Sequence, residues 1–98
     1  MYFVVMNSDK PGALATREAT RPTHRVYLRE HGRKLKLHHA GPTLDGDGKM
    51  NGTLLIVEAD DIGEVRAFVS NDPYSKAGIF EKVDIRPFAW TTGVPDGK

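Results

Sequence analysis

The hydrophobic pattern of this chain begins with two stretches that have the periods of β-strands. Residues 2–7 start with an unbroken apolar run of β-forming residues, which is typical of a strand covered on both faces. Residues 34–40 instead alternate between apolar and polar side chains. That alternation predicts a half-buried strand with Leu35, Leu37 and His39 on one face.

Two further strands are predicted later in the chain. Residues 53–58 form an apolar run after the glycine-rich loop at 45–49, so residues 34–40 and 53–58 are expected to make an antiparallel hairpin. Residues 83–90 alternate again and predict a last strand.

A helical pattern extends over residues 13–32, but Pro22 interrupts it. Proline fits the first turn of a helix and fits poorly in its interior. The sequence therefore predicts a main helix from Pro22 to Gly32, with a loop or a preliminary turn over residues 13–20. The inward face of this helix is expected to carry His24, Tyr27, Leu28 and His31.

A second helix is predicted from residue 61. Asp61 and Glu64 have the spacing of a capping box, and apolar residues follow at helical spacing. The helix is expected to end before Pro73, because a residue that precedes proline avoids the helical conformation. A short helical turn over residues 74–78 then leads to the last strand.

The predicted order is β-α-β-β-α-β, which is the order of a ferredoxin-like α+β fold with an antiparallel sheet. Both helices are expected on one face of the sheet, and a second subunit is expected to cover the other face. Residues 1–92 are interpreted as a single domain, and residues 93–98 as a flexible tail.

The composition excludes several classes of function. The chain has 98 residues, a net charge of +1 and no cysteine, so disulfides and cysteine chemistry are excluded. The balanced charge argues against dedicated nucleic-acid binding, and the basic segment 29–36 is interpreted as a solvated helix end. No apolar stretch is long enough for a membrane span and none has the pattern of a signal peptide. We therefore expect a cytoplasmic protein with no membrane partner.

His24 and Asp72 are the candidate chemical residues. His24 is placed in the first turn of its helix, where a neutral imidazole is favoured and is available as a base. Asp72, before a proline, is an ordinary helix N-cap, but its carboxylate is also expected to reach His24. Such a pair can transfer a proton or can merely join two helices.

Other residues are weaker candidates. Tyr27 and Tyr74 are candidates for lining a pocket beside this pair, and His39 for joining it from the second strand. His38 and His39 lie next to each other on a strand and point to opposite faces if the strand is regular, so we predict no metal site. The loop at 45–49 lacks the acidic and glycine positions of a calcium loop.

Several blocks of this sequence resemble those of the YciI-like (YCII-related) proteins. The blocks are Arg21-Pro22-Thr23-His24, Ala40-Gly41-Pro42, Asn71-Asp72-Pro73-Tyr74 and Arg86-Pro87-Phe88, in this order. The resemblance implies a dimeric α+β barrel with a His–Asp pair in a cleft, carried over to His24 and Asp72. Arg21, Tyr27, His39 and Tyr74 are expected to bind the substrate.

The function expected from these residues is proton transfer on a small cyclic or aromatic compound. Elimination and isomerisation both fit, because neither needs a cofactor or a nucleophile. Two alternatives stay open: a small-ligand binding or sensing domain, and an accessory domain in which the His–Asp contact is structural.

Overall fold

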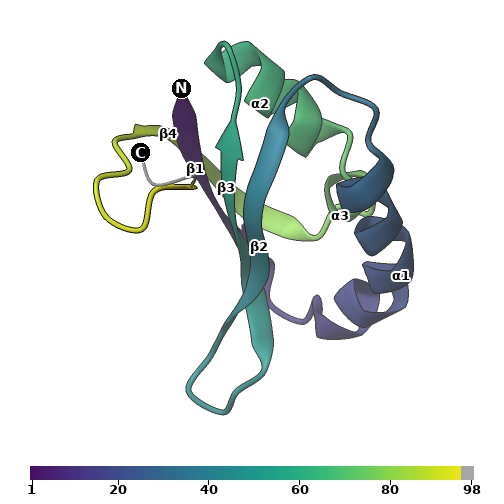
Figure 1. The fold of residues 1–98 in the computed structure, drawn as a ribbon. Coiled ribbons are helices and arrows are strands. Elements are labelled where there is room, and N and C mark those ends of the chain that lie inside the picture. Colours follow the sequence, from purple (N-terminus) through teal and green to yellow (C-terminus); the bar gives the residue numbers. More distant parts are fainter. Residues whose placement is uncertain (96–98) are drawn as a thin grey trace.

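The computed structural model describes residues 1–95 and has the predicted element order, and the short helical turn expected over residues 74–78 is present as a helix at Pro73–Lys76 (Figure 1). Residues 96–98, the end of the expected tail, lie outside the described residues. No helix within the described part is long and apolar enough to cross a membrane. The elements are β1 (Tyr2–Asp9), α1 (Leu14–Glu30), β2 (Lys36–Leu44), β3 (Met50–Glu58), α2 (Ile62–Ser70), α3 (Pro73–Lys76) and β4 (Phe80–Phe88).

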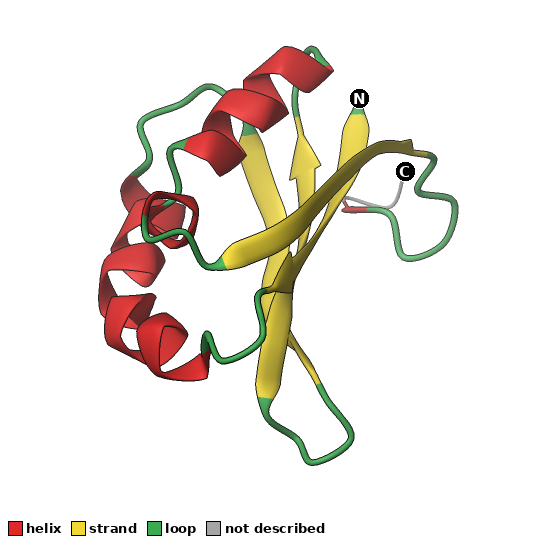
Figure 2. Cartoon of the chain, turned by 180° about the vertical axis from the view of Figure 1, so that it is seen from behind, coloured by secondary structure: helices red, strands yellow, loops and turns green. Residues whose placement is uncertain are grey.

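The strands form one antiparallel sheet in the order β2-β3-β1-β4. α1, α2 and α3 lie on one face of this sheet (Figures 1 and 2). The opposite face, called the open face below, is covered by none of these helices, although Trp90 packs against Tyr2 and His38 there. The ferredoxin-like α+β fold is therefore confirmed. The core lies between the sheet and the helices, and its fully buried members include Phe3, Val5, Leu55, Val57, Val65 and Phe68.

The predicted start of the first helix is wrong. α1 begins at Leu14, and Pro22 lies inside it at the cost of a backbone hydrogen bond. The earlier turns are held by Arg17, whose guanidinium donates to both carboxylate oxygens of Asp9 at 2.7 and 2.9 Å and to Thr53 Oγ1 at 2.6 Å. These contacts to β1 and β3 hold the helix where local propensity predicts a break.

The second strand also differs from its prediction. It continues through Pro42, which is tolerated because β2 is an edge strand. A β-bulge at His38 shifts the register, since Leu37 pairs with Val57 and His39 pairs with the next residue, Ile56. The bulge reverses the alternation, so His39 lies on the open face and the expectation that it shares a face with Leu37 is wrong.

The start of the second helix has one of the two hydrogen bonds that a capping box predicts. Asp61 Oδ1 accepts a hydrogen bond from Glu64 N at 3.0 Å. The return contact differs, because Glu64 Oε2 accepts from the backbone N–H of Asp60 instead of that of Asp61. The helix still begins as the sequence predicts.

The ion pair between Arg17 and Asp9 is buried, with side chains 2% and 5% exposed. Replacing Arg17 with Met is expected to lower the free energy of unfolding by about 3–5 kcal/mol, because it leaves a buried carboxylate unpaired. Urea denaturation measures this loss. The double variant Asp9→Asn/Arg17→Met should recover part of it, whereas Arg29→Met, on the exposed side of α1, should change little. An Arg17→Met protein as stable as the parent would refute the importance of the pair.

Gly52 of β3 lies where a side chain has no room. A Cβ at this position would collide with the backbone oxygen of Asn7 on β1 and would crowd Thr43 Oγ1 on β2. Gly52→Ala is expected to reduce the free energy of unfolding by about 1–3 kcal/mol, measured by thermal or urea denaturation. Gly46→Ala in the hairpin loop is the control, because a Cβ there meets no atom within 4 Å. Equal stability of the two variants would contradict the close packing at Gly52.

Candidate active site

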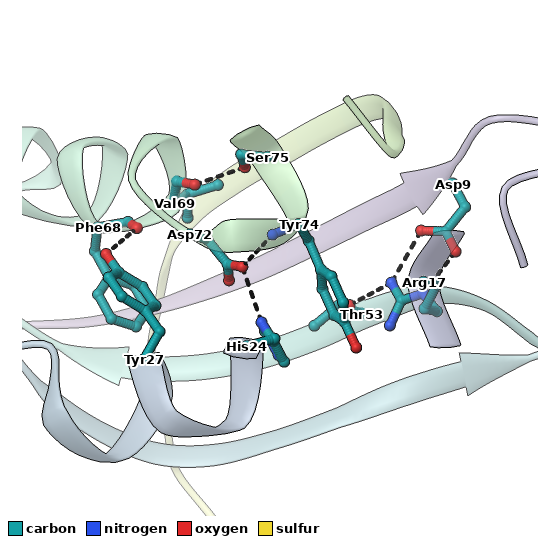
Figure 3. A network of polar contacts seen from close by, with 10 residues as sticks. All are labelled: Asp9, Arg17, His24, Tyr27, Thr53, Phe68, Val69, Asp72, Tyr74 and Ser75. Atoms are coloured by element: carbon teal, nitrogen blue, oxygen red, sulfur yellow. Dashed lines mark hydrogen bonds and ion pairs between the residues drawn. The ribbon is translucent and has the colours of Figure 1, made fainter. Parts of the chain in front are cut away.

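The structure brings His24 and Asp72 into direct contact. His24 Nδ1 lies 2.8 Å from Asp72 Oδ1, and both side chains are buried (Figure 3). The contact comes from the middle of α1 and from the junction between α2 and α3. His24 is therefore not in a first helical turn, and the argument that a helix N-terminus keeps it neutral does not apply.

The backbone around Asp72 explains why its carboxylate points at His24. Asn71 ends α2, and Asp72 then takes an extended conformation, as expected before proline. Its Oδ1 also accepts a hydrogen bond from Tyr74 N at 2.8 Å and so caps α3. The capping role and the contact with His24 use the same oxygen atom.

The ring of Tyr74 lies between His24 and Arg17 (Figure 3). It stacks on the imidazole with ring centroids 3.8 Å apart, and the Arg17 guanidinium lies 4.4 Å from its centroid. Burial raises the pKa of the Tyr74 phenol, although Arg17 and Arg21 act to lower it. Tyr74 is therefore a neutral phenol at neutral pH.

A cavity of about 140 Å³ lies beside this stack. It is bounded by one face of α1, by β2 and β3, and by α3. Engineered cavities of roughly 150 Å³ accept a benzene ring, so the space suits a small cyclic molecule. The lining residues are Arg17, Arg21, His24, Arg25, Leu28, Ala40, Gly41, Pro42, Met50, Thr53 and Tyr74.

His24 is one of the residues that line this cavity. Only Nδ1 has a hydrogen-bond partner within residues 1–95, and that partner is Asp72. In a neutral imidazole, an Nδ1–H donated to the carboxylate leaves the Nε2 lone pair free. Nε2 is therefore the atom that can exchange a proton with a molecule in the cavity.

The other expected site residues divide into two groups. Arg21 and Tyr74 line the cavity, but Tyr27 and His39 do not. The Tyr27 hydroxyl donates to the backbone oxygen of Phe68 at 2.6 Å and so ties α1 to the end of α2. His39 is exposed on the open face of the sheet.

The bulge in β2 also changes the relation between the two adjacent histidines. Both rings approach Trp90, with centroids 5.5 Å away for His38 and 5.6 Å for His39. They do not point to opposite faces as a regular strand predicts. His38 Nε2 lies 2.8 Å from Glu58 Oε1. Within the described residues, no group of three or more potential ligands is placed to hold a metal.

The sequence did not identify three of the polar residues that line the cavity. Arg17 and Arg25 lie one helical turn on either side of Arg21, and Thr53 lies opposite them on β3. The spacing of four residues was the available signal. A helix that starts at Pro22 excludes Arg17 and Arg21, so the predicted start of the helix hides this spacing.

Comparison with solved structures places this geometry among known folds. The 5-chloro-2-hydroxyhydroquinone dehydrochlorinase of Burkholderia phenoliruptrix, solved with 2,5-dihydroxybenzoquinone, is 35% identical with a TM-score of 0.82. The alignment covers 91% of this chain and 94% of that one. A NIPSNAP domain protein from Burkholderia xenovorans has a TM-score of 0.54 at 13% identity, over 97% of this chain and 98% of that one. The second similarity concerns the fold alone.

Sequence comparison gives the family. Protein YciI of Escherichia coli is 31% identical in an alignment of 94 positions that covers 90% of this chain and 96% of the relative. A Haemophilus influenzae protein is 28% identical over the same shares. The family model of the YCII-related domain matches residues 1–89. The chain therefore belongs to the family of YCII-related domains, as its sequence blocks indicated.

Proposed function

We propose that this chain is an enzyme that moves a proton with His24 in the elimination or isomerisation of a small cyclic or aromatic compound. The observation that carries the proposal is the His24 imidazole, which lines a cavity of about 140 Å³ and whose Nδ1 is held by Asp72. The related dehydrochlorinase acts on a chlorinated hydroxyhydroquinone, which is a compound of this class.

In the proposed reaction, Nε2 takes a proton from the substrate and the Asp72 carboxylate stabilises the resulting imidazolium. In an elimination, the electrons of the broken bond to hydrogen form a new double bond, and the leaving group departs with its own bonding electrons. In an isomerisation, the imidazolium returns the proton to another atom of the same ring. Neither route needs an oxidant or a reductant. Asp72 acts here as a positioning residue.

The first test uses 5-chloro-2-hydroxyhydroquinone as substrate and measures chloride release. His24→Gln is expected to lower kcat by roughly a hundredfold to ten-thousandfold, since a positioned general base contributes that much. His31→Gln is the matched control, because His31 lies on the same helix, outside the cavity. Chloride release by His24→Gln at the rate of the parent would remove the catalytic role.

A ligand-binding or sensing domain is the alternative, and in such a domain the contact between His24 and Asp72 is structural. The same carboxylate oxygen caps α3 and contacts α1, so the pair has a structural use without turnover. In that case the parent protein binds ring compounds but releases no chloride. His24→Gln then lowers the free energy of unfolding, and its effect is seen only in denaturation.

The proposal includes a homodimer formed through the open face of the sheet. By the strand register, Val4, Ile56 and Leu54 share this face with Met6 and Phe88. Met6 is 43% exposed and Phe88 is 37% exposed, so part of the apolar surface is uncovered in one chain. A second copy of the sheet would bury it.

Met6→Glu is expected to convert the dimer to a monomer, because a charge would be buried between the two sheets. Light scattering coupled to size-exclusion chromatography measures the mass. Val26→Glu is the matched control, since Val26 is equally exposed, at 45%, but lies on α1. A monomeric parent, or a Met6→Glu protein that stays dimeric, would contradict this interface.

A further inference from the structure

The cavity is lined by more positive charge than its neighbours neutralise. One face of α1 carries Arg17, Arg21 and Arg25 at intervals of four residues, and all three line the cavity. No carboxylate is among the lining residues. The charges on this face are therefore balanced from behind the cavity wall, by solvent, or by a molecule inside the cavity.

Two of the positive or ionisable groups are already balanced. The Arg17 guanidinium is paired with both oxygens of Asp9, and the His24 imidazole is paired with Asp72. These pairs fix both side chains in place. Because the two carboxylates behind the cavity are engaged in these pairs, they do not neutralise the other arginines.

Arg21 and Arg25 have no such partner. Neither makes an ion pair within residues 1–95. Arg21 is half-buried, and its charge acts on the Tyr74 phenol, whereas Arg25 is exposed. A partly buried guanidinium without a carboxylate partner, beside a cavity, is a suitable place for an anion to bind.

The remaining walls limit what this anion can be. Leu28, Met50 and Pro42 give the cavity an apolar side, and its volume suits a single ring. An inorganic anion would leave this apolar side without a contact. A flat organic anion would use both the arginines and the apolar wall.

We propose that the cavity binds its substrate as a small, planar organic anion, a ring with an ionised enol, phenol or carboxyl oxygen, held by Arg21 and Arg25. This inference rests on the proposed function and names its substrate class. It also adds to the chemistry. An oxyanion beside the two guanidiniums receives stabilisation as the ring loses a proton to His24 Nε2.

The test is the binding of a matched pair of rings, measured by isothermal titration calorimetry. The anionic probe is 2,5-dihydroxybenzoquinone, whose hydroxyls are vinylogous acids and are ionised at neutral pH. The uncharged probe is 2,5-dimethoxybenzoquinone, which has the same ring. We expect the parent to bind the anion more tightly than the uncharged ring. Added salt should weaken the binding of the anion and leave the binding of the uncharged ring unchanged.

Variants of α1 identify the residues responsible. Arg21→Met should weaken binding of the anion by roughly tenfold, and Arg25→Met by less, because Arg25 is exposed. Arg29→Met is the matched control, since it removes the same charge from α1 outside the cavity, and it should leave affinity unchanged. Thermal unfolding of each variant verifies that the fold is retained.

Three results would overturn the inference. They are equal affinity of the parent for the two rings, no binding of the anion at millimolar concentration, and unchanged affinity in both Arg21→Met and Arg25→Met. The proposed reaction is judged separately. His24→Gln should keep the affinity for the anion while it loses turnover, so a catalyst without anion selectivity and an anion binder without turnover give different results.

Discussion

The site depends on one buried carboxylate oxygen that is shared between two parts of the chain. Asp72 Oδ1 accepts hydrogen bonds from the His24 ring and from the backbone N–H of Tyr74. It therefore holds α1 against α3 and also caps the N-terminus of α3. The stacking of Tyr74 on His24 follows from this arrangement, because both rings are attached to the groups that the oxygen holds. A loss of this oxygen would affect the rotamer of the imidazole and the position of the phenol together.

A second buried ion pair anchors the N-terminal part of the same helix. Asp9 holds Arg17 at the end of β1, and Arg17 in turn covers the far side of the Tyr74 ring. The two ion pairs therefore support one aromatic side chain from both of its faces. Buried ion pairs of this kind contribute little net stability to the fold, but they fix the positions of their side chains. A binding site depends on such fixed positions.

Much of the fold could be read from the sequence, and the failures have physical causes. The strand runs and the Asp61–Glu64 cap are local signals, and the structure has the corresponding elements. The start of α1 could not be read, because long-range contacts of Arg17 outweigh the local effect of Pro22. The contact between His24 and Asp72 could be anticipated from the topology, but the unpaired state of Arg21 could not, since it depends on the absence of carboxylates from distant elements.

The bulge at His38 has a consequence for the volume of the cavity. With regular alternation from Leu37, the imidazole of His39 would face the helices, and the space beside His24 would be filled. The additional residue places Ala40 and Pro42 on that side instead, and both line the cavity. The bulge in this edge strand therefore places small side chains at the cavity. In this fold, insertion or deletion of a single residue in β2 would exchange a large side chain for a small one and so change which molecules fit, while every residue of α1 stays the same.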